Sequence, residues 1–523
     1  MNPQAPRETY VGDHHFGDAA AEAAVVRDPR TLRLILIAMC MALVAVISAV
    51  SGLNVAQQQL ATELGASQGT LLWIINGYTL VLAALLLPVG AIGDRWGRKP
   101  VLIVGISLFA VASLAAGLAG TASMLLITRL VAGVGAAMIM PVTLSVVTSS
   151  FPTEQRAGAI GVWAGFAGAG GILGLFFSSA MVDWFSWRWV FALPIVLCVA
   201  SLLLTLAVVD NSRELHEHSF DVWGGILSAL AIGGIVLAFH EGPEKGWSHP
   251  LTVAGLVAAV VAGTFFAWWE LRHPAPLLDV RLFGNRLLGN GAFNILIVFA
   301  VMFGLFLVVV QFLQAVLAYS ALKASTALLP MAALLMPLSS VAPKIANRIG
   351  IRKLLIFGTS VVTIGLVMMA TMPSVSGGYL SVLPGLLVVG AGMGLVMTPS
   401  TVAITESLPV EKQGVASALN DTVREVGGAV GVALLGSILA SGYRNEVSAV
   451  AETLPAELQE PVKDGIASTL AVAGNLGDQA LTVIDASREA FVAGWHQTMW
   501  IGAAITAVAV VVLVLRGPVD TAK

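Results

Sequence analysis

The stretch Asp94-Arg95-Trp96-Gly97-Arg98-Lys99 recurs in weaker form as Asn347-Arg348-Ile349-Gly350-Ile351-Arg352-Lys353. An arginine and a glycine keep the same spacing in both copies, and each copy follows a long apolar block. An internal repeat between apolar blocks indicates that a chain is built from two related halves. The sequence therefore predicts a duplicated architecture, with 32–212 as the N-terminal half and 288–523 as the C-terminal half.

The apolar blocks place the chain in a membrane. Of its 523 residues, 57% are hydrophobic and 11% charged, against about 45–50% and about 25% in soluble domains. The blocks number fourteen, and a block of about 20 residues spans a hydrocarbon core roughly 30 Å thick. Backbone groups cannot hydrogen-bond to lipid, so blocks of this length must be helices. We expect an all-α membrane protein with two six-helix halves and an inserted helix pair in 213–287.

Lysine and arginine set the expected orientation. They are concentrated in alternate short loops, which the positive-inside rule assigns to the cytoplasm. Both termini, including an N-terminal tail over 1–31, are then cytoplasmic, and the protein is a multi-pass protein of the cell (inner) membrane. A long outer loop, 441–493, separates the last two spans. Its apolar spacing predicts two short amphipathic helices, which form either a packed hairpin or a surface that contacts a partner or lipid; the residues are Val447, Val450, Leu454, Leu458, Ile466, Leu470 and Val472.

Composition and missing motifs exclude several function classes. A net charge of -3 with dispersed basic residues argues against nucleic acid as a partner. Cys40 and Cys198 lie inside apolar blocks and are expected to be small core residues. The sequence has no Gly-Lys-Ser phosphate loop and no His/Cys cluster with metal-ligand spacing. We therefore expect no enzyme activity, no catalytic residue, no cofactor and no metal.

The longer stretch Gly90-Ala91-Ile92-Gly93-Asp94-Arg95-Trp96-Gly97-Arg98-Lys99 resembles the loop signature between helices two and three of the major facilitator superfamily. In such a loop the acid can face the positive N-terminal end of another helix, and the glycines permit a tight turn. The basic residues are expected to stay in cytoplasmic water. The resemblance implies a gating role for Gly90, Asp94, Arg95, Gly97, Arg98 and Lys99.

The order of further segments resembles the drug:proton antiporter branch of that family with fourteen transmembrane helices. These segments are Asn54-Val55-Ala56, Asn76-Gly77-Tyr78-Thr79-Leu80, Trp187-Arg188-Trp189-Val190-Phe191 and Gly414-Val415-Ala416-Ser417-Ala418. Two residues depart from the branch. Ala49 stands where the first span usually carries an aspartate, and Leu175 replaces a proline of the fifth span. Coupling through an acid of the first span is therefore impossible.

Span thirteen carries the acids best placed for proton coupling. Asp421 and Glu425 are four residues apart, so they share one helical face, and Arg424 lies beside them. Ionisable residues inside a membrane are functional candidates, although a static ion pair is the alternative. Arg129 in span four resembles the family's intramembrane arginine. Alternatively, it lies near the outer membrane face and reaches water.

A central cavity between the halves is the expected substrate site. Candidates to line it are polar residues on otherwise apolar helices: Asn54, Asn76, Tyr78, Gln311 and Gln314. Each of them could instead form a hydrogen bond that holds two neighbouring helices together. Met302 and Phe306 are expected to be adaptable apolar contacts.

These features predict a proton-coupled efflux transporter that works as a monomer by alternating access. Its expected partners are a small hydrophobic or cationic substrate, protons and membrane lipids. A lipid or lipid-precursor transporter of the same fold is an alternative, which the replacement at Ala49 favours. A non-transporting receptor or scaffold is a second alternative, although it would not need the gating motif at Asp94.

Overall fold

The computed structural model describes residues 28–212 and 220–516. Most of the predicted N-terminal tail and the start of the predicted inserted segment, residues 213–219, lie outside these residues. Fourteen helices of the described part are long and apolar enough to cross a membrane, and that part contains no strand. The all-α membrane fold predicted from the sequence is confirmed.

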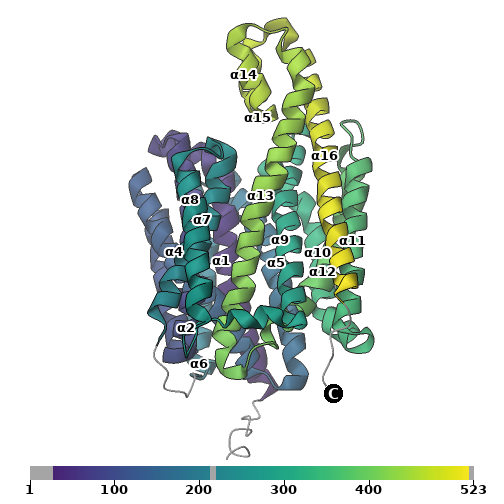
Figure 1. Cartoon of the computed structure of the whole chain (residues 1–523). Coiled ribbons are helices and arrows are strands. Elements are labelled where there is room, and N and C mark those ends of the chain that lie inside the picture. Colours follow the sequence, from purple (N-terminus) through teal and green to yellow (C-terminus); the bar gives the residue numbers. More distant parts are fainter. Residues whose placement is uncertain (1–27, 213–219, 517–523) are drawn as a thin grey trace, which may run out of the picture.

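The helices run roughly parallel in one bundle (Figure 1). The candidate spans are α1 (Pro29–Leu64), α2 (Gln68–Trp96), α3 (Arg98–Gly117), α4 (Ala122–Ser150), α5 (Thr153–Trp184), α6 (Ala192–Val208), α7 (Val222–Lys245), α8 (Pro250–Glu270), α9 (Arg286–Gln311), α10 (Ala321–Ile349), α11 (Ile351–Thr371), α12 (Gly378–Thr405), α13 (Gln413–Ala451) and α16 (Ala480–Leu515). Short helices connect some of them: η1 (Trp187–Phe191), η2 (Val280–Gly284), η3 (Phe312–Val316), η4 (Val410–Lys412), α14 (Ala456–Asp464), α15 (Ile466–Ala471), η5 (Ala473–Asn475) and η6 (Gly477–Gln479).

Helix packing repeats between two sets of six helices. In the first set α1 packs on α5, α2 and α3 pack on α4, and α3 packs on α6. In the second set α9 packs on α13, α10 and α11 pack on α12, and α11 packs on α16. The sets meet where α2 contacts α13 and where α5 contacts α10, which are equivalent pairs under the repeat. On this basis we propose the division into halves at 32–212 and 288–523.

The two loops of the sequence repeat adopt the same backbone conformation. Gly97 has φ +110° and ψ 134°, and Gly350 has φ +92° and ψ 144°. Each glycine ends one helix and caps the next, and its N–H donates to the carbonyl four residues earlier. Only glycine adopts such positive φ values without strain. The sharp turn between α2 and α3, and between α10 and α11, is therefore specified by a glycine in both copies.

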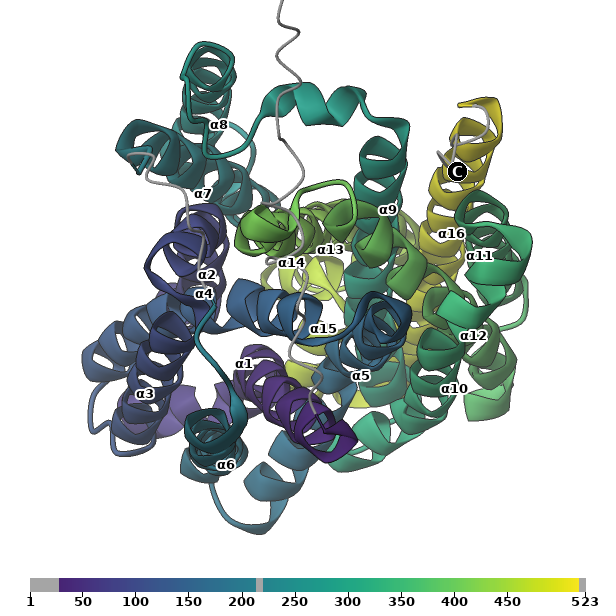
Figure 2. The same ribbon diagram turned by 90° about the horizontal axis from the view of Figure 1, so that it is seen from below.

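Helices α7 and α8 form a pair at the edge of the bundle (Figure 2). They touch through Gly234 and Gly255, because a Cβ on either would meet the carbonyl oxygen of the other at 2.6 Å or 2.9 Å. Such small residues let helices approach closely in lipid. Helix α7 also packs on α2 and α13, so the pair lies against both sets of helices. The linker 271–285, which includes η2, leads from α8 to α9 across the lower end of the bundle.

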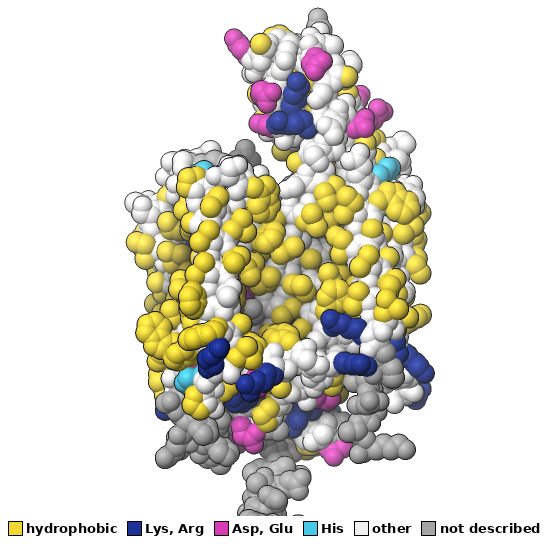
Figure 3. Space-filling view, in the orientation of Figure 1, with side chains coloured by type: hydrophobic (Ala, Val, Ile, Leu, Met, Phe, Trp, Pro, Cys, Tyr) yellow, Lys and Arg dark blue, Asp and Glu magenta, His cyan; other side chains and the backbone are white. Residues whose placement is uncertain are grey.

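Charge is distributed unevenly along the bundle axis. A broad band of hydrophobic side chains surrounds the bundle, and lysine and arginine side chains line the lower edge of that band (Figure 3). The lower end, which carries the Asp94–Lys99 loop and the linker 271–285, is called the basic end below. The opposite end carries α14 and α15 and is called the hairpin end.

The hairpin is shorter than the predicted outer loop 441–493. Helix α13 continues to Ala451 and α16 begins at Ala480, so only 452–479 lies between them. The first predicted amphipathic helix is in part the end of α13, where Val447 and Ala451 are buried. No proline occurs between Gln413 and Pro455 to stop α13 at the membrane surface. Helix α13 therefore extends beyond the apolar block from which it is predicted.

Candidate functional site

Asp94 joins the two halves at the basic end. It lies in the last turn of α2 and is 1% exposed. One carboxylate oxygen accepts a hydrogen bond from the N–H of Gly414 at 2.8 Å, and the other accepts from the N–H of Val415 at 3.1 Å. These N–H groups belong to the first turn of α13, which has no partners for them within the helix. A carboxylate there also meets the positive end of the helix dipole.

Arg98 is buried with Asp94, which contradicts the prediction that the basic residues of the loop stay in water. Its guanidinium is 2.8 Å from the Asp94 carboxylate and also donates to the carbonyl of Glu411. The negative charge of Asp94 and the carbonyl in front of α13 together provide enough partners to bury this cation. Arg95 remains exposed, and Lys99 donates to the carbonyl of Leu206.

Glycines let α2 and α13 approach at this junction. A Cβ on Gly90 would lie 2.6 Å from the carbonyl oxygen of Gly414, so the backbones are in direct contact. Gly97 has no room for a side chain either, because Asn211 occupies the space. The sequence motif therefore supplies both the carboxylate and the close approach that the contact requires.

A second contact between the halves lies between α5 and α10. The hydroxyl of Ser339 donates to the carbonyl of Gly161 at 3.0 Å, and a Cβ on Gly161 would lie 2.8 Å from the carbonyl oxygen of Ser339. Gly165 similarly faces the backbone of Met336. Together with the Asp94 junction, these contacts hold the halves together toward the basic end.

The charged residues of α13 lie deeper in the bundle. Asp421 is about 12 Å and Glu425 about 18 Å along α13 from its first residue, at 1.5 Å per residue. Asp421 is fully buried and accepts hydrogen bonds from Asn420 at 3.1 Å and Arg424 at 3.2 Å. Glu425 is half-buried and forms no ion pair within 4.0 Å among the residues that the structure describes. The cluster thus contains one paired and one unpaired acid.

Arg424 is enclosed by aromatic rings from both halves. Its guanidinium carbon lies 4.5 Å from the ring centre of Phe299 on α9 and 5.4 Å from that of Trp163 on α5. Such cation–π contacts help to compensate a buried cation for lost water. Sequence reasoning did not find either aromatic residue, because a tryptophan or phenylalanine in an apolar span carries no signal that separates it from ordinary core.

Arg129 is 1% exposed, so the alternative in which it reaches water at the outer face is wrong. Its guanidinium donates to the carbonyl of Ala49 at 3.1 Å and to that of Ile74 at 3.4 Å, and it lies 4.1 Å from the ring centre of Tyr78. No carboxylate of residues 28–212 or 220–516 lies within 4.0 Å of it. The residue that replaces the branch's aspartate therefore still contacts Arg129, but through its backbone.

The predicted cavity residues differ in burial and in their contacts. Tyr78 is buried, donates to the carbonyl of Val46 and lies within electrostatic reach of Glu425. Asn76 is half-buried, whereas Asn54, Gln311 and Gln314 are exposed. The structure thus brings Tyr78 together with Arg129 and the acidic face of α13, and the place of the other four in a cavity stays a prediction.

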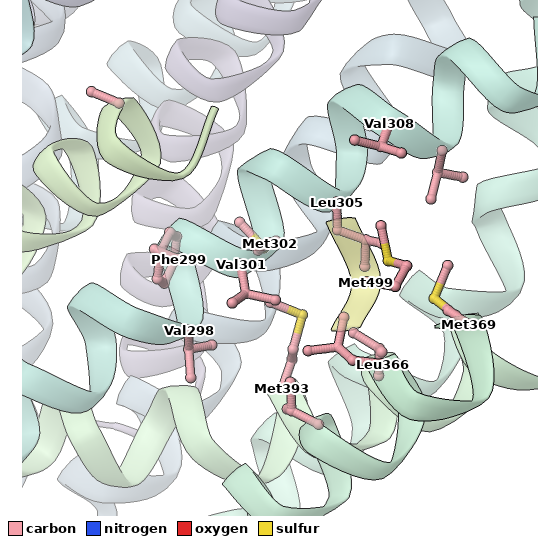
Figure 4. Close-up of a cluster of buried hydrophobic side chains, with 14 of the residues drawn as sticks. Val298, Phe299, Val301, Met302, Leu305, Val308, Leu366, Met369, Met393 and Met499 are labelled. Carbon is pink, nitrogen blue, oxygen red and sulfur yellow. The ribbon is translucent and has the colours of Figure 1, made fainter. Parts of the chain in front are cut away.

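Met302 lies in a methionine-rich core. Figure 4 shows it on α9 with Phe299 and Leu305, in a cluster of buried side chains that also includes Met393 of α12. Met302 is buried in this core. Phe306 is half-buried and packs against the same cluster. The flexible thioether side chains can fill a core whose shape changes. The same buried cluster includes residues of α2 and α5, so Met302 belongs to a core to which both halves contribute.

Comparison with known proteins agrees with this arrangement. The sequence profile of the Major Facilitator Superfamily matches residues 36–432. "Multidrug resistance protein Stp" of Mycobacterium tuberculosis is 31% identical over 438 residues, which cover 84% of this chain and 80% of Stp. "Multidrug efflux pump LfrA" of Mycolicibacterium smegmatis is 32% identical over 456 residues, covering 87% and 90% of the two chains. The "Tetracenomycin C resistance and export protein" of Streptomyces glaucescens is 31% identical over 435 residues, covering 83% and 80%.

Solved structures share the fold at low sequence identity. The human organic anion transporter MFSD10 matches with a TM-score of 0.60 and 12% identity, covering 93% of this chain and all of its own. The proton:xylose symporter XylE matches with a TM-score of 0.55 and 14% identity, covering 94% and 97%. With a family profile over most of its length, a repeated six-helix packing and the Asp94 junction between the repeats, the chain belongs to the Major Facilitator Superfamily of membrane transporters.

Proposed function

We propose that the chain exports small hydrophobic or cationic compounds from the cytoplasm in exchange for protons. The observation that carries this proposal is the charged cluster of α13, buried where aromatic rings of both halves meet. Proton-linked transporters commonly place such acids near the middle of the membrane at the interface between the repeats. The resistance and efflux proteins named above, which match over four fifths of the chain, support export as the direction.

The orientation follows from the same features. Because basic side chains favour the cytoplasmic side, we assign the basic end, and with it both ends of the chain, to the cytoplasm of the cell membrane. The Asp94 and Ser339 contacts then close the cytoplasmic side in this conformation. Alternating access requires a second conformation in which these contacts open, so that the α13 acids face the cytoplasm.

Glu425 is the acid that we assign to proton exchange. Asp421 is held by Arg424 and Asn420, so removing its charge would break the ion pair that Arg424 forms with it. Glu425 forms no such ion pair among the described residues and is partly accessible to solvent. A proton can therefore join or leave Glu425 without breaking an ion pair, whereas Asp421 and Arg424 keep the helix packing fixed around it.

Export is tested in a pump-deficient host. Cells that express the chain should accumulate less of a hydrophobic cation such as ethidium than cells with empty vector. Unchanged accumulation across a wide panel of drugs and dyes would contradict drug export, and selective movement of labelled lipids between leaflets would instead favour a lipid transporter.

Coupling is tested in proteoliposomes loaded with a pH gradient. We expect Glu425→Gln to reduce gradient-driven ethidium uptake about a hundredfold, the lower end of the range for loss of a positioned proton-transfer group. Exchange of ethidium without a gradient should persist, because the amide keeps the shape of the site. Glu406→Gln, at an exposed acid just beyond α12, is the matched control. Wild-type gradient-driven uptake in Glu425→Gln would refute the assignment.

A further inference from the structure

Two buried acids face each other at the basic end of the inserted helix pair. Asp221 immediately precedes α7, Glu270 is the last residue of α8, and they are 5% and 2% exposed. One oxygen of Asp221 accepts hydrogen bonds from the N–H of Gly224 at 2.8 Å and the indole N–H of Trp269 at 2.9 Å. One oxygen of Glu270 accepts from the N–H of Leu278 at 3.3 Å. Each carboxyl group thus has one satisfied oxygen.

The other two oxygens point into the same small space. Oδ2 of Asp221 and Oε1 of Glu270 are inaccessible and have no hydrogen-bond partner among the described residues. Each of these two oxygens lies 2.5 Å from the place that a Cβ would take on Gly224. The distance between the two oxygens is therefore at most twice this value. Buried polar atoms without a partner are rare in folded proteins, so these two oxygens require a hydrogen-bond partner. Two carboxylates this close cannot both carry a charge at low cost.

Among the residues that the structure describes, the neighbouring cations do not supply that partner. Nδ1 of His273 is 3.8 Å from Oδ2 of Asp221, but it lies 2.8 Å from the carbonyl of Ala275, to which it must donate. Lys412, in η4, lies within electrostatic reach of Glu270 but donates to the carbonyl of Pro276. No group of three or more His, Cys, Asp or Glu side chains in the described part of the chain could hold a metal ion. A single proton is the ligand that fits two facing carboxyl oxygens.

We propose that Asp221 and Glu270 bind one proton between them, as a site separate from the α13 cluster. With the proton, one carboxyl group donates to the other, and both remain buried under the linker 271–285. The linker reaches α13 through Lys412, beside the turn that Asp94 holds. The bound proton therefore fastens the inserted helix pair to the turn at which the halves meet. The inference does not depend on the exporter proposal, because it concerns neither substrate nor direction.

Infrared spectroscopy of the purified full-length protein at pH 7 tests the proposal. We expect a protonated carboxyl band in the wild type that decreases in Glu270→Gln and in Asp221→Asn. It should be unchanged in Glu241→Gln, at an equally buried acid of α7 whose carboxylate pairs with Lys245. Glu270→Gln should still fold, since its amide N–H can replace the shared O–H. A wild-type spectrum without any protonated carboxyl band would overturn the proposal even if no variant folds.

Stability against pH gives a second measurement. Above about pH 5 an unfolded carboxyl group has released its proton, whereas the folded pair keeps one. The folded state then binds more protons, so its stability falls as the pH rises through the point where the pair ionises. We expect Glu270→Gln to lack this fall. An identical fall in wild type and Glu270→Gln would overturn the proposal. If His273→Gln and not Glu270→Gln lacks the fall in stability, the proton binds to the histidine. Greater stability in sodium than in choline would indicate a metal cation.

Discussion

Asp94→Asn is expected to open the basic end of the protein and to reduce transport more than a hundredfold. The variant keeps the size of the side chain but removes the carboxylate that pairs with the buried Arg98 and turns an amide N–H group toward the N-terminus of α13. Breaking a buried ion pair by removing one charge costs about 3–5 kcal/mol. Each 1.4 kcal/mol is a factor of ten in an equilibrium, so the closed conformation should lose its advantage.

Thiol labelling measures this shift directly. Ser339→Cys places a reporter at the buried contact between α5 and α10, and the two native cysteines are themselves buried. A membrane-impermeant maleimide added at the basic end should label the reporter faster in Asp94→Asn than in the parent. The matched control is Asn347→Ala, since Asn347 holds the equivalent place in the repeat but is exposed. Equal labelling of parent and Asp94→Asn, with full transport, would refute a gating role for Asp94.

Gly431→Ala is expected to be among the most damaging single substitutions in the second half. A Cβ at Gly431 of α13 would overlap the backbone carbonyl of Ala300 on α9. Overpacking usually costs about 1–3 kcal/mol, and the upper end applies here because a backbone carbonyl cannot rotate away as a side chain can. Thermal unfolding of the detergent-solubilised protein should show a clearly lower midpoint, and Gly431→Leu should prevent accumulation of folded protein.

Gly428→Ala is the matched control on the same helix. Its Cβ would lie 3.2 Å from the ring of Phe303, which can turn slightly. Both substitutions gain about 0.5–1 kcal/mol from the better helix propensity of alanine, so their difference isolates packing. A Gly431→Ala protein as stable as Gly428→Ala would show that α9 and α13 are not in backbone contact.

The sequence predicted those parts of the molecule that depend on local pattern. Span length follows from bilayer thickness, and the turn between α2 and α3 follows from a glycine that alone tolerates its backbone angles. Asp94 could be singled out because a carboxylate beside glycines, at the end of a span, fits a helix N-terminus. In each case the residue type and its immediate neighbours contain the physical reason.

What the sequence did not reveal depends on distant partners. Arg98 looks like any basic residue of an inner loop, and only the arrival of α13, more than 300 residues later, makes its burial possible. Asp221 and Glu270 lie at the ends of apolar blocks, and nothing local shows that α7 and α8 place them face to face. The carbonyl of Ala49 replaces a side chain at Arg129, and backbone atoms carry no sequence signal.

The length of α13 couples movement at one of its ends to movement at the other. Helix α13 is one uninterrupted helix of 39 residues, about 58 Å long at 1.5 Å per residue. The Asp94 junction contacts the first turn of this helix, Asp421 and Glu425 lie within its first third, and the hairpin follows its last residue. A stiff rod pivoting by about 5° sweeps its far tip through roughly 5 Å at this length. Opening the Asp94 junction by a pivot of α13 therefore moves the hairpin at the opposite end of the helix, so the position of the hairpin reports whether the junction is open or closed.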